Sequence, residues 1–169
     1  MNSDLNSVGS ITLGWWSKHL GNREHASAKA LAARLRRSAP ITALAEPAVH
    51  SLAQDLNVGP HQADQLMRLA SLLAEIRDHD SKPLARCLGG ADPITSRLTM
   101  SHLRFQRLLR ADGDELTTLL RRAIKLAGRR CNVARLAKDL FSWEQARPRW
   151  CFDYFSSSQP NDTNTETEQ

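Results

Sequence analysis

Helical periodicity is the feature of this sequence that most limits its fold, and it is clearest in residues 116–129. At about 100° per residue, apolar side chains fall on one side of this segment and basic side chains on the other. The apolar side holds Leu116, Leu119, Leu120, Ala123, Ile124 and Ala127. The basic side holds Arg121, Arg122, Lys125 and Arg129.

Residues 103–110 show a similar division, although Leu103 interrupts the basic side. Apolar side chains on one face are Phe105, Leu108 and Leu109, and basic ones on the other are Arg104, Arg107 and Arg110. No segment of the chain alternates with a period of two residues. We therefore predict an all-α fold, with about eight or nine helices in two packed helical halves.

Basic charge is concentrated in one third of the chain. Residues 1–96 hold ten Lys/Arg and nine Asp/Glu, residues 97–150 hold thirteen and five, and residues 151–169 hold none and four. The net charges are +1, +8 and −4, which agree with the formal +5 of the whole chain. Clustered arginine is typical of nucleic-acid binding, because each neutralised phosphate releases counterions. A membrane surface or an acidic protein is an alternative partner, but the planar guanidinium suits phosphate.

Chain length and targeting signals limit the class of protein. The 169 residues suffice for one substantial core or two small ones. The sequence lacks the long apolar run of a transmembrane helix and the basic-then-apolar start of a signal peptide. Cys87, Cys131 and Cys151 have no CxxC spacing, which favours reduced thiols that pack as small hydrophobes in a cytoplasmic protein.

Turn residues and composition divide the chain into parts. Trp16 is expected in the core, and packing is favoured over base stacking for Trp15 beside it. Pro47 is expected to begin one helix and Asn132 to cap another, while Asp112 or Asp114 caps the basic helix. The predicted parts are a flexible N-terminus (1–9), an N-terminal helical part (10–90), a connection (91–97), a C-terminal basic helical part (98–156) and a disordered acidic tail (157–169).

Residues 52–66 have the pattern of a helix-turn-helix, with a turn at residues 57–59 and a second helix from His61. This pattern leaves open a DNA-binding transcriptional regulator that contacts DNA through residues 61–68. In the second helix only Gln62, Gln65 and Arg68 could contact the edges of DNA bases, and the rest of the helix is apolar. An ordinary helical hairpin is therefore favoured.

Catalytic signatures are lacking in the sequence. The six histidines are dispersed, and there is no HExxH motif, Gly-x-Ser-x-Gly motif or nucleotide-binding loop. This pattern predicts a protein that is not an enzyme and that uses no cofactor, metal or small-molecule substrate. A nuclease with dispersed carboxylates and a scaffold with a basic docking face stay open as alternatives.

Six segments, in their order and spacing, resemble the CasB family, the small subunit of the type I-E CRISPR surveillance complex Cascade. They are Trp15-Trp16, Ala33-Arg-Leu-Arg-Arg37, Arg104-Phe-Gln-Arg-Leu-Leu-Arg-Ala-Asp112, Leu119-Leu-Arg-Arg-Ala-Ile124, Leu140-Phe-Ser-Trp143 and Trp150…Tyr154-Phe155. The resemblance covers roughly residues 10–156.

This resemblance implies an all-helical, non-enzymatic, metal-free protein that acts in antiviral defence. It implies as partners the other Cascade subunits, a second copy of the chain, CRISPR RNA and target DNA, and no membrane. Such a subunit helps to hold the RNA–DNA hybrid and the displaced strand of the R-loop. Because guide pairing supplies sequence choice, binding to single- and double-stranded nucleic acid is expected to be sequence-tolerant and salt-dependent.

Eight basic residues form the predicted nucleic-acid site. Six follow from the resemblance: Arg36 and Arg37 match an Arg-Arg pair, Arg104 and Arg110 lie in a basic helix with a phenylalanine, and Arg121 and Arg122 match a second pair. Arg107 and Lys125 rest on the helical-face argument.

Overall fold

The structure is a computed structural model that describes residues 2–37 and 39–157, with side chains from Ser7 onward. The predicted acidic tail lies outside the described residues, apart from Ser157. Ten α-helices, one short 3₁₀ helix and two very short strands in the described residues confirm the all-α fold. In chain order they are α1 (Asn2–His19), α2 (Ala26–Arg37), α3 (Pro40–Leu44), α4 (Pro47–Asp55), η1 (Pro60–Gln62), α5 (Ala63–Leu73), β1 (Asp78–His79), α6 (Leu84–Gly89), α7 (His102–Arg110), α8 (Gly113–Leu126), β2 (Arg130–Cys131), α9 (Val133–Phe141) and α10 (Trp143–Ser156).

Helix α1 begins at Asn2, eight residues before the predicted N-terminal helical part at residues 10–90. Packing against α9 explains the difference: a Cβ added at Gly9 would lie 3.0 Å from the carbonyl oxygen of Ala134. The chain at Gly9 therefore lies directly on α9, and this tertiary contact supports a helix that local propensity predicts only weakly. Trp15 and Trp16 are both buried, and the Trp15 indole N–H donates to the carbonyl oxygen of Ala48 at 2.7 Å.

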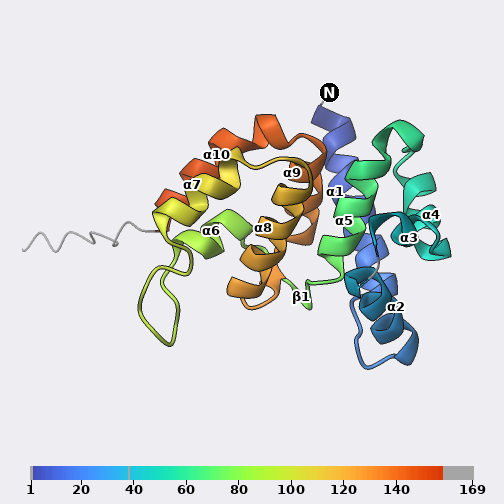
Figure 1. The fold of residues 1–169 in the computed structure, drawn as a ribbon, viewed down its shortest axis with the longest axis horizontal. Helices are drawn as coiled ribbons and strands as arrows, with labels where there is room; N and C mark the ends of the chain where they lie inside the picture. The colour runs from blue at the N-terminus through green and yellow to red at the C-terminus, as the bar shows by residue number, and fades with distance from the viewer. Residues whose placement is uncertain (1, 38, 158–169) are drawn as a thin grey trace, which may run out of the picture.

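Helices from the beginning and the end of the chain share one core. Figure 1 shows α6, α7 and α10 on one side and α2, α3 and α4 on the other, with α5, α8 and α9 between them. Helix α1 packs along α9, and α6 packs against α10. A Cβ at Gly89 would overlap the carbonyl oxygen of Tyr154, so only glycine permits this approach of α6 to α10. The predicted division at residues 91–97 stays a prediction.

A pair of short strands connects the end of α5 to the start of α9. Strands β1 and β2 are parallel, with Asp78 opposite Arg130. The turn before β2 contains Gly128 with a φ of +72° and Arg129 with a φ of +60°. Asn132 caps α9 as predicted, since its side-chain oxygen accepts the backbone N–H of Arg135 at 3.0 Å. This turn places Arg129 beside the C-terminal end of α5.

Three further local expectations can be compared with the described residues. Helix α4 begins at Pro47 as predicted. Cys131 is buried and Cys87 and Cys151 are half-buried, and all three are free thiols. Burial raises the pKa of the Cys131 thiol to about 12. Among the described residues, no helix is both long and apolar enough to span a bilayer.

Candidate nucleic-acid interface

Helices α7 and α8 meet at a tight corner. Ser101 caps α7 by accepting the backbone N–H of Arg104 at 3.5 Å, and Ala111 is buried where α7 ends. Asp112 occupies the N-cap position of α8, as one of the two predicted options, but its side chain makes no capping hydrogen bond. Gly113 follows with a φ of +52°, a left-handed conformation that glycine adopts without strain.

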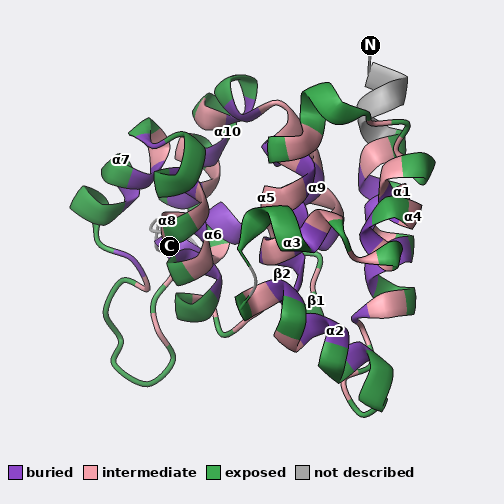
Figure 2. Ribbon diagram, turned by 45° about the vertical axis from the view of Figure 1, so that its right-hand side comes forward, coloured by how far each residue is buried: buried purple, intermediate pink, exposed green. Residues whose placement is uncertain are grey.

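The two helices enclose a groove between their exposed faces, and we call it the α7–α8 groove. It has a volume of about 470 Å³. Figure 2 shows that much of the surface of α7 is exposed. The apolar floor is formed by Met100, Leu108, Leu119 and Leu126, and the basic lining by Arg104, Arg107, Arg122 and Lys125. The fold thus brings four of the eight predicted site residues into one groove.

Most of the basic side chains at the α7–α8 groove are available to an external anion. Arg104, Arg122 and Lys125 are exposed, and none forms an ion pair with another described residue. Arg107 is exposed but pairs with Glu115, with 2.8 Å between its Nη2 and the carboxylate Oε1. Arg110, exposed at the end of α7, also has no ion pair among these residues.

Arg121 lies apart from its neighbour Arg122. Its Nε is 3.4 Å from Oε1 of Glu75, and Arg129 pairs with the other oxygen of the same carboxylate. The Glu75 side chain is only 3% exposed, so this is a largely buried ion pair at the end of α5. Arg122 therefore lines the α7–α8 groove, whereas its sequence neighbour Arg121 is half-buried against Glu75.

Arg36 and Arg37 end α2, on the opposite side of the molecule from α7 (Figure 1). Arg37 is exposed and Arg36 is half-buried. They do not join the α7–α8 groove. Arg36 instead lies near Arg23, whose pKa is lowered by burial and then by the charges of Arg36, Arg77 and Arg129.

A second group of arginines, around Glu75, was not predicted from the sequence. The Arg23 guanidinium donates to the carbonyl oxygens of Ala74 and Ile76, both at 3.0 Å. Arg77, exposed, follows directly in the chain. The group comes from segments far apart in sequence, so no linear motif reveals it, and the only local signal is a glutamate at the end of an apolar helix.

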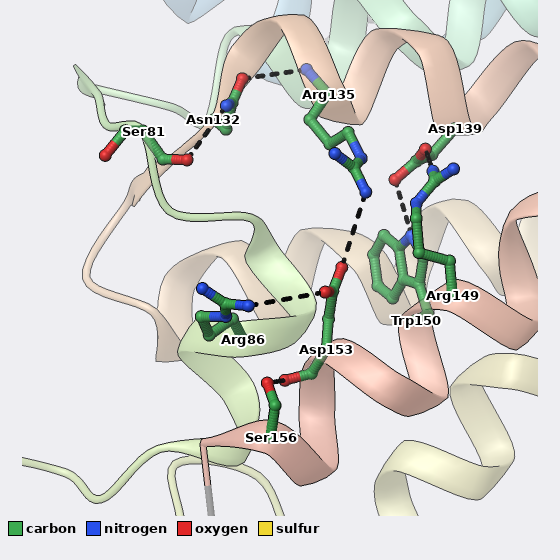
Figure 3. A network of polar contacts seen from close by, with 9 residues as sticks. All are labelled: Ser81, Arg86, Asn132, Arg135, Asp139, Arg149, Trp150, Asp153 and Ser156. Carbon is green, nitrogen blue, oxygen red and sulfur yellow. Dashed lines mark hydrogen bonds and ion pairs between the residues drawn. The ribbon is translucent and has the colours of Figure 1, made fainter.

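Other arginines hold helices together. In Figure 3, Asp153 of α10 lies between Arg86 of α6 and Arg135 of α9, with nitrogen–oxygen distances of 4.0 and 3.9 Å. Asp139 of α9 is buried and accepts the indole N–H of Trp150 at 2.7 Å, and it also pairs with Arg149. We call these contacts the α6–α9–α10 network.

Helix α5 is not exposed as a recognition helix that contacts DNA would be. It is buried along one side by Leu66, Leu69, Ala70, Leu72 and Leu73. Of the polar residues that the helix-turn-helix pattern offers to bases, Arg68 donates to the Thr117 hydroxyl at 3.0 Å and to the Gly113 carbonyl oxygen at 3.3 Å. The structure therefore favours the helical hairpin in this segment.

Comparisons with known proteins agree with this fold. The sequence matches the family described as CRISPR-associated protein Cse2 over residues 31–155. A Cse2-family protein from Thermus thermophilus superimposes with a TM-score of 0.71 at 26% identity, covering 89% of this chain and 99% of that one. A chain of Escherichia coli Cascade bound to a PAM-containing double-stranded DNA target gives a TM-score of 0.62 at 22% identity, covering 88% and 94%. No curated protein matches by sequence.

The family match covers both the α2 segment and the α7–α8 groove, and so includes every predicted site residue. It confirms the resemblance that the order and spacing of the sequence segments indicated. This protein belongs to the Cse2 family of CRISPR-associated proteins.

Proposed function

We propose that this protein is the non-catalytic small subunit of a type I-E Cascade complex and that its α7–α8 groove binds nucleic-acid phosphates. In this role it stabilises the R-loop, in which CRISPR RNA pairs with target DNA and one DNA strand is displaced. The other Cascade subunits and a second copy of the chain are its protein partners, in the cytoplasm. It needs no cofactor, metal or small-molecule substrate.

The observation that supports this proposal most is the gathering of unpaired cations on an exposed surface. Arg104, Arg122 and Lys125 line one groove without ion pairs to described residues. An R-loop exchanges one duplex for another of similar stability, so a few charge-assisted phosphate contacts suffice to shift the balance. The same contacts carry no sequence information, as a subunit that binds beside guide-paired DNA requires.

The remaining predicted site residues take secondary roles in this proposal. Arg110 extends the α7–α8 groove along α7, and Arg107 contributes once an incoming phosphate competes with Glu115. Arg36 and Arg37 form a separate contact on the α2 side of the molecule. Arg121, half-buried against Glu75, adds to the local potential and binds phosphate less directly than Arg122.

Binding of the full-length chain to several unrelated single strands and duplexes tests the nucleic-acid part of this proposal. We expect similar affinities across sequences at one salt concentration. Lys125→Ala should lower them, whereas the matched change Lys18→Ala, at an exposed position of α1, should not. A strong preference for one duplex that Lys125→Ala leaves unchanged would instead favour the regulator with contacts on residues 61–68.

R-loop formation by reconstituted Cascade tests the part of the proposal that concerns the complex. Complexes are assembled with wild-type protein, the Arg104→Ala/Arg122→Ala variant or the Lys18→Ala variant, and R-loop lifetime is measured on a matched target. The double variant should assemble normally and shorten the lifetime, and Lys18→Ala should behave as wild type. An unchanged lifetime in a complex that contains the double variant would contradict R-loop stabilisation by this groove.

A further inference from the structure

Exposed aromatic side chains lie where α7 begins and α10 ends. Three aromatic side chains of α10, Trp143, Trp150 and Tyr154, are buried. Phe155, in contrast, is 51% exposed, and its ring centroid lies 5.5 Å from that of the exposed His102. These two rings form an aromatic surface that the fold leaves uncovered by described residues.

Buried aromatic contacts hold this surface in place. The Tyr154 ring stacks on Phe105 with a centroid distance of 3.9 Å, and its hydroxyl donates to the carbonyl oxygen of Met100 at 2.6 Å. Phe155 packs edge-on against Tyr154 at 5.1 Å, and His102 contacts the same ring at 5.7 Å. Because both exposed rings rest on a fixed core residue, their arrangement is set before any ligand binds.

The aromatic surface adjoins the α7–α8 groove. Met100 lines the groove and also receives the Tyr154 hydrogen bond. Arg104, which lines the groove as well, follows His102 within the first turn of α7, although the two side chains project from different sides of the helix. Figure 1 shows the start of α7 beside the end of α10. A strand whose phosphates occupy the groove therefore reaches the exposed rings by passing over the N-terminal end of α7, beside Met100.

We propose that His102 and Phe155 stack on unpaired bases of a single strand whose phosphates lie in the α7–α8 groove. This inference rests on the proposed function and adds a preference for single strands. Every base has a π-face, so stacking tolerates any sequence, whereas the bases of a duplex already stack on each other. Cations beside exposed aromatic rings are the combination that single-strand binding surfaces use.

Two strands of equal length separate stacking from charge: oligo-dT and an abasic strand, which keeps the phosphates and lacks the bases. The full-length chain is titrated with each strand, as wild type, Phe155→Leu, Phe155→Trp and Ile41→Ala. Leucine keeps an apolar side chain at position 155 but removes the π-face, whereas tryptophan keeps the π-face. Ile41→Ala is a control at an exposed apolar position of α3. All three changes leave buried residues untouched.

We expect wild type to bind oligo-dT about fivefold more tightly than the abasic strand. Phe155→Leu should bring the ratio of the two affinities close to one, while Phe155→Trp and Ile41→Ala should leave this ratio unchanged. Because the four native tryptophans are all buried, the emission that Phe155→Trp adds is the signal to follow: oligo-dT should quench it and the abasic strand should not.

Four outcomes would overturn the inference. A ratio that Phe155→Leu leaves unchanged would exclude stacking, and an equal loss for both strands would indicate a structural or protein-docking role for Phe155. Absence of binding to the abasic strand in wild type, or binding that does not depend on salt, would contradict the proposed function itself and the inference with it. The abasic strand therefore reports on the groove, and the ratio reports on the aromatic surface.

Discussion

Arginines serve different purposes in two neighbouring regions, the α7–α8 groove and the α6–α9–α10 network. In the groove, Arg104 and Arg122 are exposed and lack a carboxylate partner among described residues. In the network, Arg149 and Arg135 pair with Asp139 and Asp153, whose side chains are 4% and 15% exposed. All four of these arginines come from the basic stretch at residues 97–150.

The difference shows that a buried acceptor decides the role of an arginine more than its position in a charge run does. An exposed ion pair contributes at most about 1 kcal/mol to stability, whereas breaking a buried one costs about 3–5 kcal/mol. Network arginines therefore contribute to the stability of the fold. Groove arginines can be replaced with little loss of stability, and their charge is available to a ligand.

The largest expected effect is a loss of stability from a substitution in the α6–α9–α10 network. Asp139→Ala removes the acceptor of the buried Trp150 N–H and the partner of Arg149, so we expect a loss of about 3 kcal/mol in unfolding free energy. Asp139→Asn keeps an oxygen for Trp150 and should lose less. Urea denaturation measures both variants. The distinction between the groove and the network would be wrong if Asp139→Ala left the stability unchanged yet lowered the nucleic-acid affinity of the folded protein.

The adjacent residues Arg121 and Arg122 allow the sharpest comparison. Arg121→Ala leaves Glu75 with Arg129 as its remaining partner and should destabilise the protein by about 1–2 kcal/mol. Arg122→Ala should change stability by less than about 0.5 kcal/mol. Nucleic-acid affinity should follow the opposite order, with the larger loss for Arg122→Ala. Equal effects of the two changes in both measurements would mean that the two sides of α8 do not differ in role.

A smaller effect is expected when a carboxylate is removed beside the groove. Glu115→Gln frees Arg107 from its ion pair and removes a negative charge, so affinity for DNA should rise on the order of twofold. Glu24→Gln, the same change at an exposed site far along the chain, is the control. The gain should vanish at high salt. A decrease in affinity would show that the Arg107–Glu115 pair positions the groove.

The smallest effect lies outside both regions, at His19. Burial and the charge of Lys18 lower its pKa, and Asp55 opposes the shift. The unfolded chain, with a histidine pKa of about 6.5, therefore takes up the proton first as the pH falls. Stability should be constant above that value and decrease slightly below it, and His19→Gln should remove this part of the decrease. Urea midpoints of the two proteins across this pH range measure the difference.

Local sequence signals predicted much of the fold. Pro47 and Asn132 mark helix starts because a proline in the first turn and a capping amide act within one turn of chain. The groove was predictable in the same way: Arg104 and Arg107 share a face of α7, and Arg122 and Lys125 share a face of α8. Periodicity identifies such faces without knowledge of the tertiary structure.

The missed features depend on contacts between distant segments. Arg121 falls on the polar side of its helix, but only the packed structure places the carboxylate of Glu75 beside it. The extension of α1 to Asn2 rests on its contact with α9. The arginines around Glu75 come from separate parts of the chain, and the exposure of Phe155 depends on how α10 meets α7. No window of sequence contains these relations.

The dependence of single-strand binding on salt tests the central claim most directly. The slope of log K against log salt is measured for wild type and Arg122→Ala with the same strand. Loss of one phosphate contact should flatten the slope by about 0.7. The proposal predicts this flattening together with an unchanged urea midpoint, and an unchanged slope would contradict it.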